Sequence, residues 1–165
     1  MKFFSLFIIF LGSISNILAQ NRDIANVLNR LNSNKIPYIY PGELELGKET
    51  IILDAREWEE YKVSKIPGAI YVGFNSFDIR KIKTIIPSND NKIVIYCSIG
   101  VRSERIAEKI IKAGYKNVFN LWGGIFEWKN EGKVVVDQNG RSTEKVHAYS
   151  QKWGIYLKNG IKVYE

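Results

Sequence analysis

The chain contains a single cysteine, Cys97, in the stretch YCSIGVRSERIAEKI. This residue ends an apolar run at 92–97 and is followed by a short loop and then by a helical pattern. Cysteine reacts through its thiolate, and an ordinary thiol is mostly protonated at neutral pH. Chemistry at Cys97 therefore needs surroundings that stabilise a negatively charged sulfur.

The loop after the cysteine can provide those surroundings. Gly100 allows backbone conformations that other residues resist, so successive N–H groups can point toward one centre. The helix that begins near Arg102 directs its positive end to the same place. With Cys97 as the nucleophile, the expected substrate-binding loop comprises Ser98, Ile99, Gly100, Val101, Arg102 and Ser103. The competing hypothesis is that Cys97 only fills a buried space, as many free cysteines do.

The elements that would position this loop alternate between strands and helices. Strands are expected at 38–40, 50–55, 92–97 and 117–122, and a turn followed by another strand is expected at 66–73. Helices are expected at 24–32, 56–62, 102–114 and 74–86, the last capped by Asn75 or Ser76. This order predicts an α/β domain with a central parallel sheet flanked by helices on both sides. The uninterrupted apolar run at 92–97 is typical of a central strand, and ligands collect beyond the carboxyl ends of such strands.

The two ends of the chain differ from this pattern. Residues 1–19 have a basic start, an apolar run and small residues near Ala19, which predicts a signal peptide and export to the periplasm or the medium without a stable membrane anchor. The main domain is then expected at 20–132. Residues 133–165 are expected to form an extension packed on it, with a β-hairpin around Asn159 and Gly160.

The composition narrows the classes of partner. The net charge is +7, but the basic residues are spread singly and carry no nucleic-acid-binding motif. A mild preference for small anions is the most that this charge indicates. No metal or cofactor is expected. The single histidine, His147, lies in the extension and is interpreted as a packed or surface residue.

Two stretches resemble one known family. YCSIGVRSERIAEKIIKAGYKNVFNLWGGIFEWKNEG resembles the active-site half of rhodanese-like domains, and IILDAREWEEYKVSKIPGAIYVGF resembles their first half. The resemblance implies a sulfurtransferase in which Cys97 takes the outer sulfur of a small anionic donor such as thiosulfate. A thiol, possibly on a protein, or cyanide would then accept the sulfur from the persulfide.

The resemblance leaves other functions open. Related phosphatases and arsenate reductases use a cysteine-to-arginine loop one residue longer than the six residues from Cys97 to Arg102, so this loop favours sulfur transfer. A non-catalytic binding or regulatory module is the other alternative, although such modules commonly lack the cysteine. An exported sulfur relay to a partner protein would share the same chemistry.

The resemblance also suggests supporting roles. Arg102 would either hold the anion or face water from the helix end. Asp54 would support neighbouring loops through hydrogen bonds, and Arg56 would pair with Glu60 across one helical turn. The Gly-Gly turn at 123–124 would allow close backbone packing, and two tryptophans would belong to the core, Trp122 and Trp128.

Overall fold

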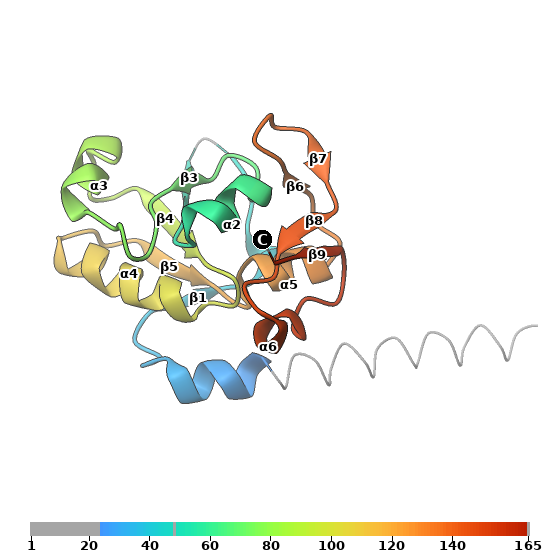
Figure 1. Ribbon diagram of the computed structural model, residues 1–165. Helices are drawn as coiled ribbons and strands as arrows, with labels where there is room; N and C mark the ends of the chain where they lie inside the picture. The colour runs from blue at the N-terminus through green and yellow to red at the C-terminus, as the bar shows by residue number, and fades with distance from the viewer. Residues whose placement is uncertain (1–23, 48, 165) are drawn as a thin grey trace, which may run out of the picture. The chain divides into compact units, whose positions relative to one another are not determined.

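The computed structural model describes residues 24–47 and 49–164 (Figure 1). Its centre is a five-stranded sheet with the order β1-β5-β4-β2-β3, and every pairing in it is parallel. Helices flank the sheet, which confirms the predicted fold class. The strands are β1 (Tyr38–Ile39), β2 (Thr50–Asp54), β3 (Ile70–Tyr71), β4 (Lys92–Tyr96) and β5 (Val118–Leu121).

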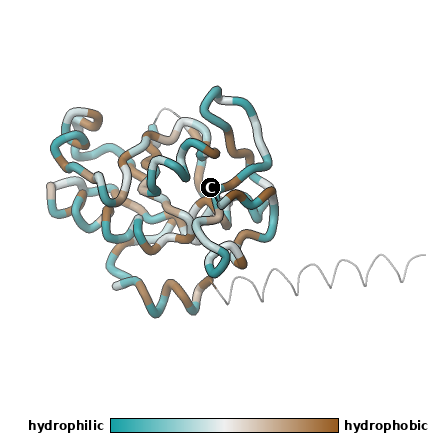
Figure 2. The backbone as a smooth tube through the Cα atoms, viewed as in Figure 1, coloured by the Kyte–Doolittle hydropathy of each residue, from teal (hydrophilic) through white to brown (hydrophobic). Residues whose placement is uncertain are grey.

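The central position of β4 is confirmed. Ile93 and Ile95 face a core that they share with Ile106 and Ile110, while Val94 and Tyr96, which alternate with them, are also buried. Figure 2 shows hydrophobic stretches along these inner strands. Because β4 is covered on both faces, its carboxyl end is the first point at which its side chains can meet a ligand.

Three of the predicted helices are present with shifted ends, as α2 (Trp58–Val63), α3 (Ile79–Ile85) and α4 (Val101–Lys112). The sequence patterns do not predict the 3-10 helix η1 (Pro41–Glu43) or the helices α5 (Gly124–Asn130) and α6 (Gln151–Gly154). The cap of α3 is Asp78 and not Asn75 or Ser76, because the Asp78 carboxylate accepts a hydrogen bond from Arg80 N at 2.9 Å.

The C-terminal extension contains a β-hairpin, but at a different place from the one predicted. Strands β6 (Val135–Val136) and β7 (Ser142–Thr143) are antiparallel neighbours. The prediction of a hairpin around Asn159 and Gly160 is wrong. Strand β9 (Ile161–Val163) pairs with β8 (Lys145–His147), and the two strands are parallel. Gly160 uses its φ of 99° to pass close to the backbone oxygen of Glu144, where a Cβ would come within 2.8 Å.

This extension lies beside the main domain in Figure 1, where β8 is close to α2. Backbone hydrogen bonds of 2.9 Å in both directions join Lys65 to Val136. On the other side, Asn130 of α5 donates to Tyr156 O and accepts from Lys158 N. The extension is therefore attached to two segments, one before and one after the loop of residues 98–103.

The N-terminal part can be described only from residue 24. Residues 24–31 are helical, in agreement with the helix predicted at 24–32. The predicted leader at 1–19 lies outside the described residues. Within the described ranges, no helix is both long and apolar enough to cross a membrane.

Candidate active site

Cys97 lies immediately after β4, at the carboxyl edge of the sheet, as predicted. Only 1% of the residue is exposed, yet it lines a cavity of about 140 Å³. The sulfur is therefore shielded from bulk water without being enclosed in the hydrophobic core. The other residues around the cavity are Ser98, Ile99, Val101, Arg102, Tyr149 and Trp153.

The loop turns back over the sulfur at Gly100. This glycine has a φ of 108°, in the left-handed region that other residues rarely adopt, and α4 begins at the next residue. The Gly100 N–H donates a hydrogen bond to Cys97 Sγ at 3.2 Å. A main-chain N–H and the N-terminus of a helix thus lie at the sulfur, where the sequence predicts several successive N–H groups.

Ser103 provides a second polar contact beneath the sulfur. Its hydroxyl lies 3.6 Å from Cys97 Sγ and 2.7 Å from Asn120 Oδ1. Because the hydroxyl has one proton, the shorter contact to Asn120 is the better hydrogen bond, and Gly100 is the principal donor to the sulfur. Asn120 Nδ2 in turn donates to Gly100 O at 2.8 Å, so this buried amide holds the loop in place.

These surroundings favour the thiolate. Burial raises the pKa of the Cys97 thiol, but the positive charge of Arg102 and hydrogen bonds from Ser103 and Gly100 outweigh burial and leave this pKa below its ordinary value. A larger fraction of Cys97 is therefore ionised at neutral pH than in an ordinary cysteine.

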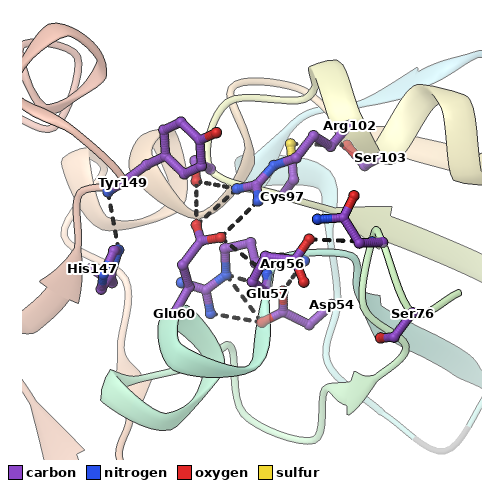
Figure 3. A network of polar contacts seen from close by, with 12 residues as sticks. Asp54, Arg56, Glu57, Glu60, Ser76, Cys97, Arg102, Ser103, His147 and Tyr149 are labelled. Atoms are coloured by element: carbon purple, nitrogen blue, oxygen red, sulfur yellow. Dashed lines mark hydrogen bonds and ion pairs between the residues drawn. The ribbon is translucent and has the colours of Figure 1, made fainter. Parts of the chain in front are cut away.

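Arg102 lines the cavity and forms an ion pair that the sequence does not predict. Its guanidinium does not face water, since Nη1 and Nη2 donate to Glu60 Oε2 and Oε1 at 2.6 and 2.8 Å, and Nη2 also donates to Ser98 Oγ at 3.0 Å (Figure 3). Burial raises the pKa of Glu60, but the hydrogen bond and charge of Arg102 outweigh this and lower the pKa overall. Both groups are therefore charged, and they neutralise each other beside Cys97.

Arg56 pairs with a different carboxylate from the one expected. The predicted Arg56–Glu60 pair is wrong, because the Arg56 guanidinium forms a bidentate contact with Asp54, with Nη2–Oδ2 at 2.6 Å and Nε–Oδ1 at 3.0 Å. The Glu60 carboxylate does not pair with Arg56, because it accepts hydrogen bonds from the Arg102 guanidinium and from Glu57 N. Both Asp54 and Arg56 are fully buried.

The Asp54–Arg56 pair supports the neighbouring loops, as predicted for Asp54. Asp54 also accepts from Tyr96 Oη at 2.6 Å, and Arg56 donates to Ser64 O at 2.6 Å. Tyr96 Oη accepts from Ile66 N at 3.2 Å. This network therefore joins the ends of β2 and β4 to the segment that precedes β3.

The turn at Gly123 and Gly124 packs directly against the nucleophile loop. A Cβ at Gly124 would lie 2.3 Å from Cys97 O and 2.7 Å from Ser98 O, which confirms the need for close backbone packing. The first amides of α5 donate to the same two oxygens, from Ile125 N at 2.9 Å and from Phe126 N at 3.1 Å. Trp122 and Trp128 are buried, as expected.

Sequence reasoning misses several residues of the site. It predicts Arg56 and not Arg102 as the partner of Glu60. The only sequence feature that distinguishes Asn120 is that it is a polar residue in an apolar strand. Tyr149 and Trp153 come from the extension and reach the cavity only through tertiary packing. His147 is packed, as interpreted, and its Nδ1 accepts a hydrogen bond from Tyr149 N at 3.1 Å.

Comparisons with known proteins agree with this geometry. The sequence profile of the rhodanese-like domain matches residues 41–131. A tRNA uridine(34) hydroxylase of Streptococcus pneumoniae is 29% identical over 80% of this chain, which spans 42% of the hydroxylase.

Two solved structures are also similar. A rhodanese-related protein of Thermoplasma volcanium has 30% identity and a TM-score of 0.53, covering 61% of this chain and 97% of that protein. A thiosulfate sulfurtransferase of Pseudomonas aeruginosa has 23% identity and a TM-score of 0.58, covering 84% of this chain and 26% of that protein, and it supports the fold alone.

Proposed function

The chain belongs to the rhodanese-like domain family, and from that premise we propose that it is a sulfurtransferase. Cys97 is the nucleophile, and the loop of residues 98–103 binds the transferred sulfur. The donor is thiosulfate or another compound with a sulfane sulfur. The acceptor is a thiol, or cyanide in an assay.

The reaction has two balanced steps. The Cys97 thiolate attacks the outer sulfur of the donor, the donor's S–S bond breaks, and sulfite leaves when thiosulfate is used. The new sulfur then carries the negative charge of the Cys97 persulfide. An acceptor thiolate attacks this outer sulfur and leaves the Cys97 thiolate as it was, so no external oxidant or reductant is consumed.

One observation carries this proposal: the Gly100 N–H donates to Cys97 Sγ at 3.2 Å, at the N-terminus of α4 and beside a cavity. A main-chain donor and a helix N-terminus stabilise an anion without a general base. The same groups suit the persulfide anion, whose outer sulfur would extend into the cavity.

Two other functions on this fold are less well supported. A non-catalytic module has no need of a cysteine with a lowered pKa that lines a cavity. A phosphatase or arsenate reductase would need room for a tetrahedral oxyanion, and the loop from Cys97 to Arg102 spans only six residues. The hydroxylase relative is more than twice as long as the matched region, so its activity is not carried over to this chain.

The setting of the reaction remains a proposal as well. Export to the periplasm or the medium rests on the composition of residues 1–19, and mass spectrometry of the protein made in its native host would show whether this segment is removed. A chain that retains all of these residues would contradict the proposed export.

Formation of thiocyanate from cyanide and a sulfane-sulfur donor tests the function. We expect thiocyanate from the wild-type protein with thiosulfate or an organic thiosulfonate, and none from Cys97→Ser. An aryl phosphate serves as the contrasting substrate. Thiocyanate formation that survives Cys97→Ser, or hydrolysis of the aryl phosphate in its place, would contradict the proposal.

A further inference from the structure

The cavity above Cys97 is completed by the C-terminal extension and not by the sheet domain alone. Tyr149, which follows β8, and Trp153 of α6 form part of its wall, together with Ile99 and Val101. Both aromatic residues lie beyond the region that matches the family, which ends at residue 131. This part of the wall therefore lies outside the matched domain.

The position of Tyr149 is fixed by several contacts. Its φ of 64° lies in the left-handed region, which is costly for a residue with a large side chain. Its amide donates to His147 Nδ1, and its ring lies 4.8 Å from the guanidinium carbon of Arg102 (Figure 3). The surrounding structure thus holds an unfavourable backbone conformation that places this ring at the cavity.

The charges around the cavity do not favour a dianion. Arg102 is the one cationic side chain among the described residues that line it, and its charge is neutralised by Glu60, which is itself only 2% exposed. The Cys97 thiolate adds a negative charge at the same place. Arg56 is bound to Asp54, and the Nζ atom of Lys152 lies 5.7 Å from the centroid of the Trp153 ring. The Glu60 carboxylate beside Cys97 therefore repels a second negative charge on a donor in the cavity.

The size of the cavity suits a small apolar group. An apolar protein cavity of about 150 Å³ can hold a benzene molecule, and this one has a volume of about 140 Å³. Its aromatic and aliphatic side chains offer an apolar surface that a highly charged donor would not use.

We propose that Tyr149 and Trp153 make the site selective for a sulfane-sulfur donor that bears one negative charge and a small apolar group, in preference to the thiosulfate dianion. The inference rests on the proposed sulfur transfer at Cys97 and specifies its donor. Organic persulfides and organic thiosulfonates have this chemistry. The Cys97 thiolate attacks their outer sulfur, the S–S bond breaks, and the organic thiolate or sulfinate leaves with the bonding electron pair.

Benzenethiosulfonate and thiosulfate form a matched pair of probes, because a phenyl ring replaces one charged oxygen of the second compound. We measure kcat/KM for each donor with the full chain and cyanide as acceptor. Wild-type protein should prefer benzenethiosulfonate by at least about tenfold. Trp153→Ala should lower kcat/KM for benzenethiosulfonate much more than for thiosulfate and so remove most of this preference. Trp153→Phe should restore much of it.

Two further variants complete the test. Ile161→Ala, at an exposed apolar position of the same extension and outside the cavity, should leave the preference unchanged. Tyr149→Gly removes the ring and relieves the positive φ, so it tests the wall even if Trp153→Ala fails to fold. Equal use of both donors by the wild type, or a preference that survives loss of either ring, would overturn the inference while leaving the sulfurtransferase proposal intact. Failure of every donor to transfer sulfur would overturn both.

Discussion

Arg102 and Glu60 form a bidentate ion pair that joins the first turn of α4 to α2 beside the nucleophile. Their side chains are 16% and 3% exposed, and the two N–O distances are 2.6 and 2.8 Å. The cation stabilises the Cys97 thiolate, while the carboxylate opposes it and orients the cation. This pair therefore influences both the reactivity of the sulfur and the stability of the fold.

Replacement of Glu60 should make Cys97 more acidic. In Glu60→Gln the Arg102 charge is no longer neutralised, so the pKa of the Cys97 thiol should fall below that of the wild type. The pH dependence of alkylation by iodoacetamide measures this change. Glu59→Gln is the matched control, because Glu59 is exposed on the same helix and pairs with Lys62. An unchanged or raised pKa in Glu60→Gln would contradict the electrostatic account.

Replacement of Arg102 should raise the pKa of the Cys97 thiol and lower the stability of the fold. Arg102→Met removes the charge that lowers the pKa of Cys97, so this pKa should rise. It also leaves the Glu60 carboxylate buried without its cation, which should lower the free energy of unfolding by about 3 kcal/mol.

Urea denaturation of Arg102→Met measures that loss. Arg80→Met breaks the exposed pair with Asp78 and should leave the denaturation midpoint almost unchanged. If the two variants lose the same stability, the Arg102–Glu60 pair has no special structural role.

The wild-type protein should remain reactive at a lower pH than an ordinary thiol. Because the pKa of Cys97 is lowered, the thiolate should persist below the pKa of about 8.5 of a free cysteine and be lost as the pH falls through the lowered value. The midpoint of the pH dependence of sulfur loading should therefore lie below the ordinary pKa of a free cysteine. A midpoint above that ordinary pKa would show that burial dominates over Arg102 and the loop donors.

Close packing between Gly124 and the nucleophile loop should make this glycine indispensable. Gly124→Ala places a Cβ against Cys97 O and Ser98 O, which are backbone atoms that cannot rotate away. Gly132→Ala is matched to it, because Gly132 also has a positive φ but has no atom within 4 Å of the position that a Cβ would take. Gly132→Ala should cost about 1 to 2 kcal/mol of stability.

Gly124→Ala should cost a further 1 to 3 kcal/mol, roughly the penalty of overpacking, and it should also slow sulfur loading. Thermal denaturation and the loading rate, measured on both variants, separate the clash from the backbone strain. Equal stability and equal rates in the two variants would show that the loop moves away at no cost.

Much of the fold follows from local patterns. The apolar runs that end at Asp54 and Cys97, and the glycine that ends the helical pattern at Gly114, are features of neighbouring residues, and the structure confirms the elements that they predict. The Asn159–Gly160 turn signal is misleading, because β9 finds its partner in β8, at a distance in the sequence and in the parallel direction. A dipeptide signal says nothing about such a partner.

The site is predictable only where it is local. Cys97 and Gly100 belong to one loop, so their meeting follows from the sequence. Glu60 could pair with Arg56 or with Arg102. The outcome depends on how α2 is oriented relative to α4, and the spacing of residues in the sequence does not reveal this orientation. Tyr149 reaches the cavity through the packing of the extension and carries no sequence signal at all.

Intact-protein mass spectrometry after incubation with a sulfane-sulfur donor tests the central claim most directly. In the absence of reducing agents, wild-type protein exposed to thiosulfate or benzenethiosulfonate should gain the mass of one sulfur atom, located on Cys97 and released by cyanide. Cys97→Ser should gain nothing. A wild-type protein that gains no sulfur from either donor, or gains it equally in Cys97→Ser, would contradict the account.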